Sequence, residues 1–193
     1  TELMISISNL TKTYGGGRPA VDRLDLFVND GEIFGFIGPN GAGKSTTIKM
    51  LTGILQPDAG SVNINGEDMW ADPVAAKWQI GYVPDSPDLY EALSGTEYLN
   101  FMADVYDVPL AERKRRTKKY GEMFEMLDAL HNPIKSYSHG MRQKLVIMGS
   151  LLHDPRVWIL DEPMVGLDPH AAHFLKEEMR AHCKRGNTVF FST

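Results

Sequence analysis

The segment GPNGAGKST at residues 38–46 fits the pattern G-x-x-x-x-G-K-[ST] from Gly38 to Ser45. It follows a short apolar run at residues 33–37 and leads into a segment with helical periodicity at residues 44–52. Glycines let the backbone wrap closely, so that several N–H groups can point at phosphate oxygens. The sequence therefore predicts a strand, a phosphate-binding loop and a helix, in that order.

Each chemical requirement of a bound nucleoside triphosphate has a candidate residue in this loop. The helix N-terminus contributes a positive dipole, Lys44 a charge for the β- and γ-phosphates, and Ser45 a hydroxyl group for Mg²⁺. We therefore predict that the nucleotide is bound by the loop residues Gly38, Pro39, Asn40, Gly41, Ala42, Gly43, Lys44, Ser45 and Thr46.

Two carboxylates end a second apolar run, VWILDEP at residues 157–163. In α/β sheets, ligand-binding groups lie at the carboxyl ends of the strands, so Asp161 is a candidate to hold the Mg²⁺ shell. Glu162 would point elsewhere, which makes it the candidate to polarise an attacking water. Such a pair can also cap a neighbouring helix, but next to a phosphate loop we favour nucleotide hydrolysis.

Composition limits the classes of function and location that the chain can have. The 193 residues are 42% hydrophobic with a net charge of −5, which argues against nucleic acid as the main partner. The single cysteine, Cys183, excludes an internal disulfide and suits a reducing compartment. No apolar run approaches the roughly 20 residues that cross a bilayer, so a membrane role would require a partner.

Apolar patterns also predict the order of elements. Strands are expected at residues 3–8, 23–28, 33–37, 61–66, 80–84, 157–162 and 188–192. Helices are expected between residues 96 and 130, with Pro109 separating two of them, then to residue 153 and at residues 169–185. Strands at both ends around a helical stretch predict an α/β core with a helical subdomain.

The segment YSHGMRQK, Tyr137 to Lys144, allows two interpretations. Ser138 and His139 could form a nucleophile and its base, or the segment could be the start of a helix that holds an anion. The segment lies shortly before ILDEP and is followed after it by GLDP at residues 166–169. With the phosphate loop, this order and spacing resembles the ATP-binding subunit of ABC transporters over essentially the whole chain.

The resemblance implies a fold and an organisation. We expect an α/β P-loop NTPase core with a mixed sheet, an N-terminal antiparallel β part and a helical subdomain insert. Residues 1–86 would form the N-terminal part of the core, residues 87–153 the helical subdomain ending in the signature helix, and residues 154–193 the C-terminal part. The family places a switch histidine at the position after residue 193, so we expect weak turnover from residues 1–193 alone.

The resemblance also implies a partner for the segment at residues 137–141. In the family this signature faces the γ-phosphate bound to a second copy of the subunit, so Ser138 and Gly140 are expected to contact that phosphate. ATP would thus join two copies head to tail. Tyr14 occupies the place where the family stacks an aromatic ring on adenine, and Asp168 the place of an aspartate that contacts the second copy.

Two departures from the family pattern concern the site. Asp85 stands where the family usually has glutamine, and its carboxylate could reach Mg²⁺ but cannot donate a hydrogen bond. His139 and Met141 replace a glycine and a glutamine of the signature, and these replacements could weaken its binding to the second copy's ATP.

The resemblance implies that the protein binds and hydrolyses ATP with Mg²⁺ to energise a membrane transporter. Its motif details favour an exporter of the multidrug or antibiotic type. The expected partners are a membrane permease and a second ATP-binding subunit, with no nucleic acid, and the expected location is cytoplasmic, peripheral on the inner face of the cell membrane. The alternative is a non-transport ABC ATPase that acts on ribosomes or DNA.

Overall fold

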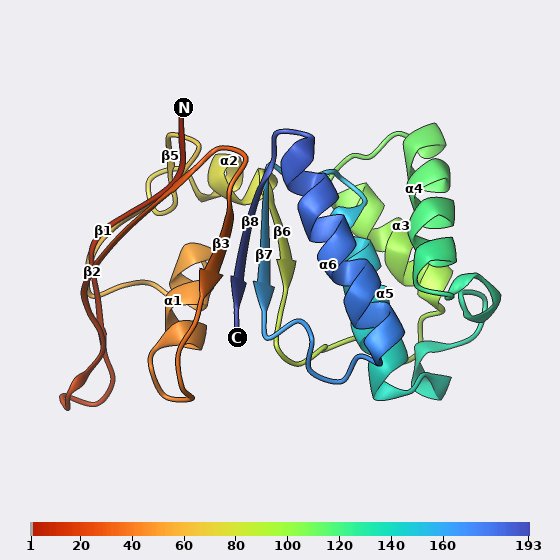
Figure 1. The fold of residues 1–193 in the computed structure, drawn as a ribbon, viewed down its shortest axis with the longest axis horizontal. Coiled ribbons are helices and arrows are strands. Elements are labelled where there is room, and N and C mark those ends of the chain that lie inside the picture. The colour runs from red at the N-terminus through yellow and green to blue at the C-terminus, as the bar shows by residue number, and fades with distance from the viewer. Residues whose placement is uncertain (1) are drawn as a thin grey trace.

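The computed structural model describes residues 2–193, which fold into two sheets and the helices around them (Figure 1). The antiparallel sheet has the strand order β2-β1-β4-β5 and the parallel sheet has the order β3-β8-β7-β6. The antiparallel strands are β1 (Leu3–Thr13), β2 (Pro19–Asn29), β4 (Ala59–Ile64) and β5 (Glu67–Asp68). The parallel strands are β3 (Ile33–Phe36), β6 (Ile80–Val83), β7 (Val157–Asp161) and β8 (Thr188–Ser192).

Helix α1 (Lys44–Leu51) lies between the two sheets (Figure 1). Ile48 and Leu51 are fully buried, in one cluster with Ile7 of β1 and Phe190 of β8. This helix begins directly after the phosphate loop, so packing on both of its sides fixes the position of the loop.

Strand β7 is buried on both of its faces. Val157 and Ile159 face the cluster that contains α1, whereas Trp158 and Leu160 belong to a second cluster formed with the helices. Successive side chains of a strand point to opposite faces, so a strand covered on both sides has a continuous apolar sequence. This explains why VWIL shows no alternation and why its first polar residue, Asp161, marks the edge of the sheet.

The helices α3 (Gly95–Val105), α4 (Leu110–Met123), α5 (His139–Leu151) and α6 (Pro169–Lys184) lie on one side of the parallel sheet (Figure 1). Ser94 begins α3 with a capping box that includes Glu97. Pro109 caps α4, as expected for the residue that separates two helices.

Helical structure between residues 96 and 130 is less continuous than we predicted. Helix α4 ends at Met123, and the short 3₁₀ segments Leu127–Ala129 and Ile134–Ser136 precede α5. Glu125 has a φ of 56°, in the left-handed region that a helix cannot continue through. The structure also contains a short helix that we did not predict, α2 (Pro73–Trp78), which Asp72 caps through the N–H of Ala75.

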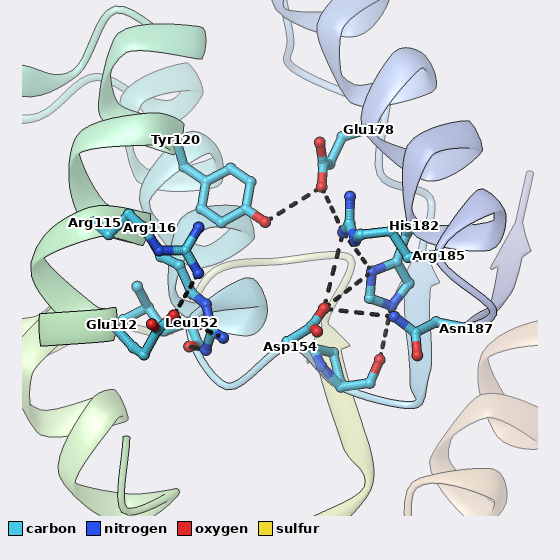
Figure 2. A network of polar contacts seen from close by, with 11 residues as sticks. Glu112, Arg115, Arg116, Tyr120, Leu152, Asp154, Glu178, His182, Arg185 and Asn187 are labelled. Atoms are coloured by element: carbon cyan, nitrogen blue, oxygen red, sulfur yellow. Dashed lines mark hydrogen bonds and ion pairs between the residues drawn. The ribbon is translucent and has the colours of Figure 1, made fainter. Parts of the chain in front are cut away.

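A buried polar network joins α4 to α6 (Figure 2). The Glu178 side chain of α6 is 2% exposed, accepts a hydrogen bond from the Tyr120 hydroxyl at 3.3 Å and pairs with Arg185 at 3.0 Å. His182 hydrogen-bonds to the Pro155 carbonyl at 2.7 Å. Because a buried carboxylate is tolerated only when it is paired, these contacts hold the helices in one arrangement on the core.

The expected α/β class, with an antiparallel β part and a helical region, is confirmed. The strands form one antiparallel and one parallel sheet rather than joining in one mixed sheet. The domain boundaries after residues 86 and 153 stay predictions. Among residues 2–193, no helix is both long enough and apolar enough to cross a membrane.

Candidate functional site

The phosphate loop connects β3 to α1 and has the backbone that its glycines permit. Gly41 and Gly43 have φ angles of 85° and 83°, a region that side chains other than glycine rarely adopt. A Cβ atom on Gly43 would lie 2.4 Å from the Ala20 carbonyl oxygen of β2. Glycine is therefore required at position 43 both for its φ angle and for the close approach of β2.

The Lys44 ammonium group is held by three oxygen atoms. It donates hydrogen bonds to the carbonyls of Gly38 at 2.5 Å and Thr193 at 2.7 Å, and to Oε1 of Glu162 at 3.2 Å. An ammonium group has three donors, so this set uses all of them. The group is thus fixed between the loop and the ends of the parallel strands, where a phosphate oxygen would take the place of one of these acceptors.

Asp161 lies at the end of β7 and is 1% exposed. Its Oδ1 accepts a hydrogen bond from Ser192 of the neighbouring strand β8 at 2.7 Å. Burial raises the pKa of the Asp161 carboxyl above its ordinary value, and the charge of Asp85 contributes to the increase. Hydrogen bonds from Ser192 and Ser45 oppose this effect on the pKa.

These groups fit a magnesium ion in part. Ser45, Asp161 and Asp85 offer the hard oxygen atoms that Mg²⁺ prefers. The pKa of Asp161 is raised first by burial and then by the charge of Asp85, and a cation would neutralise that charge. Residues 2–193 contain no group of three or more His, Cys, Asp and Glu side chains that could hold a metal ion. Mg²⁺ commonly keeps several waters and takes other ligands from substrate phosphates, so the small protein set is compatible with it.

Glu162 points away from Asp161 because the backbone turns between them. Its φ is 48°, in the left-handed region, and its N–H donates to the Ser192 hydroxyl at 3.1 Å. Its side chain is 28% exposed and lies beside Lys44. The predicted difference in direction between the two carboxylates is thus present, whereas the catalytic role of Glu162 stays a prediction.

A cavity of about 690 Å³ lies over the loop. It is lined by Ala20, Asn40, Gly41, Gly43, Lys44, Ser45, Thr46, Asp85, Glu162 and Val165. The volume is within the ordinary range of small-molecule sites. The structure therefore brings together most of the predicted loop residues, the candidate base and Asp85, which is 40 positions away from Ser45 in the sequence.

Some of the predicted site residues lie outside this lining. Gly38, Pro39 and Ala42 belong to the loop, and Asp161 is buried and hydrogen-bonded to Ser45. Tyr14 lies in the connection between β1 and β2, is 53% exposed, and has the Lys12 ammonium group 5.9 Å from its ring centre. Its contact with adenine stays a prediction.

Ser138 and Gly140 lie at the start of α5 and do not line this cavity. The Ser138 hydroxyl caps the helix by accepting a hydrogen bond from the N–H of Met141 at 3.2 Å. The His139 ring lies against Gly166 instead, since a Cβ atom on Gly166 would be 2.5 Å from its Cδ2. The local geometry therefore favours the helix start over a nucleophile with its base.

Sequence reasoning missed four residues of the site, one of which is Thr193, whose carbonyl accepts a hydrogen bond from Lys44. Ser192 supports Asp161 and Glu162, and Ala20 and Val165 line the cavity. Ser192 had a detectable signal, because it is a polar residue that ends the apolar run TVFF, as Asp161 ends VWIL. Nothing in the local sequence distinguishes Ala20 or Val165.

Comparisons with known proteins show which family the chain belongs to. The family model described as ABC transporter matches residues 21–165. The ABC transporter ATP-binding protein YhcH of Bacillus subtilis (strain 168) is 37% identical over 191 residues, with 98% of this chain and 61% of that protein covered. The daunorubicin/doxorubicin resistance ATP-binding protein DrrA of Streptomyces peucetius is 39% identical over 189 residues, with 98% and 57% covered.

A solved structure described as the ATP binding subunit of an ABC transporter superposes with a TM-score of 0.93 at 35% identity, covering 98% of this chain and 79% of that one. The chain thus spans about 60% of the length of the curated relatives that it matches. The family model and the relatives agree on the family, and the superposed structure agrees with the α/β fold. The chain therefore belongs to the ABC transporter family, as an ATP-binding domain of the ABC ATPases.

Proposed function

We propose that the protein binds Mg²⁺-ATP in the cavity over the phosphate loop and hydrolyses it to energise a membrane exporter of the multidrug or antibiotic type. The observation that carries the ATPase part is the convergence of Lys44, Ser45 and Glu162 on one cavity. The exporter part is supported by DrrA, which is described as a daunorubicin/doxorubicin resistance protein.

In this proposal different residues of the chain bind the phosphates, bind Mg²⁺ and accept the proton. Lys44 and the loop N–H groups hold the β- and γ-phosphates, and Ser45, Asp161 and Asp85 hold Mg²⁺. When bound, the ion neutralises charge on the phosphates. Glu162 accepts the proton of the attacking water, a role for which its partly exposed carboxylate beside the cavity is suited.

A second copy of the subunit completes the site. Ser138 and Gly140 lie outside the cavity that contains Lys44, so in this proposal they contact the γ-phosphate held by the other copy. Asp168 caps α6 through the N–H of Ala171 and lies 3.6 Å from the ammonium group of Lys144 on α5. In this proposal Asp168 also contacts the second copy. ATP then favours the dimer, because it binds the assembled form more strongly than the separate subunits.

A permease supplies the path through the membrane, and the ATP-binding subunit is cytoplasmic and peripheral on the inner face of the cell membrane. The test is whether the purified protein releases phosphate from ATP in the presence of Mg²⁺, and whether it co-purifies with a membrane permease. Mg²⁺-independent release would contradict the ATPase proposal. Co-sedimentation with ribosomes in place of a permease would contradict the exporter.

ATP-driven assembly is tested separately. In the Glu162→Gln variant, slow hydrolysis should trap a dimer when ATP and Mg²⁺ are added, detected by size-exclusion chromatography with light scattering. Adding Ser138→Ala should weaken that dimer, whereas adding Ser136→Ala, which changes a nearby serine that hydrogen-bonds only within its own turn, should not. A dimer that forms equally with and without ATP would contradict the proposal.

Tyr14 is tested by comparing two ligands. Base stacking contributes about 1–3 kcal/mol, so Tyr14→Ala should weaken ATP binding roughly tenfold and leave the binding of inorganic triphosphate unchanged. Tyr90→Ala, which changes another exposed tyrosine outside the cavity, is the control. Equal losses for both ligands would remove adenine stacking from the proposal.

A further inference from the structure

The side chain of His139 contacts Gly166, and both residues are exposed at the surface. A Cβ atom on Gly166 would lie 2.5 Å from Cδ2 and 2.8 Å from Nε2 of His139, distances that real Cβ atoms do not show. The φ angle of Gly166 is 85°. The imidazole ring thus occupies the space that a side chain at position 166 would need, and it joins the first residue of α5 to the loop that follows Glu162.

A second contact lies one turn further along α5. Gln143 is 1% exposed, and its Nε2 donates a hydrogen bond to the Pro163 carbonyl at 3.4 Å. Its Oε1 has no partner among the described residues. Residues four apart lie on the same face of a helix, so His139 and Gln143 contact this loop from one face.

Gly140 and Lys144, which are also four residues apart on α5, contact the same loop. A Cβ atom on Gly140 would lie 3.1 Å from the Gly166 carbonyl oxygen, which shows how closely the two backbones approach. Lys144, four residues later, places Nζ 3.6 Å from Oδ2 of Asp168. The first two turns of α5 therefore contact residues 163–168 along most of that loop.

These contacts bear directly on the candidate base. Glu162 immediately precedes Pro163, has a φ of 48°, and its carbonyl accepts a hydrogen bond from the N–H of Val165 at 3.3 Å. Among residues 2–193, the pair with Lys44 at 3.2 Å is the one polar contact of its side chain.

We propose that His139 is a positioning residue: its imidazole ring packs on Gly166 and keeps the loop after Glu162 against α5, so that the carboxylate stays directed into the cavity. The inference rests on the proposed function for the role of Glu162. Ser138, the neighbour of His139, faces the second copy's nucleotide in that proposal. The ring thereby links the residue that contacts the other copy's phosphate to the base of its own site.

The first test is hydrogen exchange measured without nucleotide. His139→Gly should increase the exchange of the amides of residues 164–167 by about tenfold, because the loop opens more often when the ring is absent. His139→Phe, which retains a flat ring, should restore the protection. Unchanged protection in His139→Gly would overturn the proposal.

Kinetics then separate positioning from binding. His139→Gly should lower kcat for ATP hydrolysis several-fold with KM unchanged, and His139→Phe should recover most of kcat. Loss of kcat in both His139→Gly and His139→Phe, or an increase in KM alone, would contradict positioning through Gly166. If hydrogen exchange responds as expected while neither the wild type nor the His139→Gly variant hydrolyses ATP, the contact between His139 and Gly166 stands and the proposed function fails.

The second test is a double-mutant cycle on thermal unfolding. Gly166→Ala should lower the melting temperature through both its positive φ and its clash with the ring, and His139→Gly should relieve the clash. Gly186→Ala is the matched control, because Gly186 has a φ of 88° and nothing within 4 Å of its would-be Cβ. The pair His139 and Gly166 should be non-additive and the pair His139 and Gly186 additive; equal additivity in both cycles would refute the contact.

Discussion

The Lys44 ammonium group lies 3.2 Å from Oε1 of Glu162, so the phosphate-loop lysine and the candidate base contact each other across 118 positions of sequence. The contact directs both side chains toward one cavity. It also sets a competition, because the carboxylate and a phosphate oxygen would both attract the same ammonium group.

Glu162→Gln is expected to separate hydrolysis from binding. Glutamine cannot accept a proton from water, and a positioned base contributes roughly 10²–10⁴-fold, so phosphate release should fall by about that factor. ATP should bind as well or better, because a neutral amide competes less for Lys44. Phosphate-release assays and titration with a fluorescent ATP analogue check both parts, with Glu177→Gln on the exposed face of α6 as the control. A loss of binding as large as the loss of turnover would contradict this prediction.

Lys44→Ala should weaken triphosphate binding by about 10- to 100-fold, as expected when one charge-assisted hydrogen bond worth roughly 1.5–3 kcal/mol is removed. Lys49→Ala is the matched control, since Lys49 lies on the same helix with an exposed side chain. Isothermal titration with ATP distinguishes the two variants. Similar affinity in both would mean that Lys44 does not contact the phosphates.

Local sequence was sufficient to predict the loop and the two carboxylates. The glycine pattern of residues 38–45 indicates a phosphate loop from the local sequence alone, and a polar residue after a continuous apolar run marks the end of a buried strand. Asp161 and Glu162 could therefore be assigned to an edge of the sheet, and their different directions follow from the turn at Glu162.

The side chains that contact the site from other parts of the chain could not be predicted in the same way. Ser192 reaches Asp161 only because β8 pairs with β7 in parallel register, and the apolar pattern does not specify which strands pair. The contact of His139 with Gly166 likewise depends on how α5 lies against a loop 27 positions away. The end of α4 was misjudged because Glu125 adopts a positive φ, which its residue type does not signal.

Asp161→Asn should make the protein more stable at neutral pH and inactive. Because the folded-state pKa of Asp161 is raised, its contribution to the free energy of unfolding is greatest below the unfolded value of about 3.9 and is lost as pH rises through the folded pKa. Asparagine removes the buried charge and keeps an acceptor for Ser192.

Thermal unfolding with a chelator present checks this prediction. Asp161→Asn should unfold at a higher temperature than the wild type at pH 7, and the difference should shrink as pH falls toward about 4. Glu177→Asn, which changes an exposed carboxylate on α6, is the control and should show little dependence of that kind. A lower melting temperature for Asp161→Asn at pH 7 would mean that its ionised form is stabilised by the fold.

Tyr120→Phe tests the network that holds α4 on α6 (Figure 2). The Tyr120 side chain is buried, and its hydroxyl donates to Glu178, which keeps its pair with Arg185 when the hydroxyl is removed. We therefore expect the free energy of unfolding to fall by about 1 kcal/mol, the typical contribution of one hydrogen bond, rather than by the larger cost of an unpaired buried charge. Urea unfolding measures it, and Tyr90→Phe, whose ring is 72% exposed, should change nothing. Equal stability of the two variants would show that this hydrogen bond does not contribute to holding the helices together.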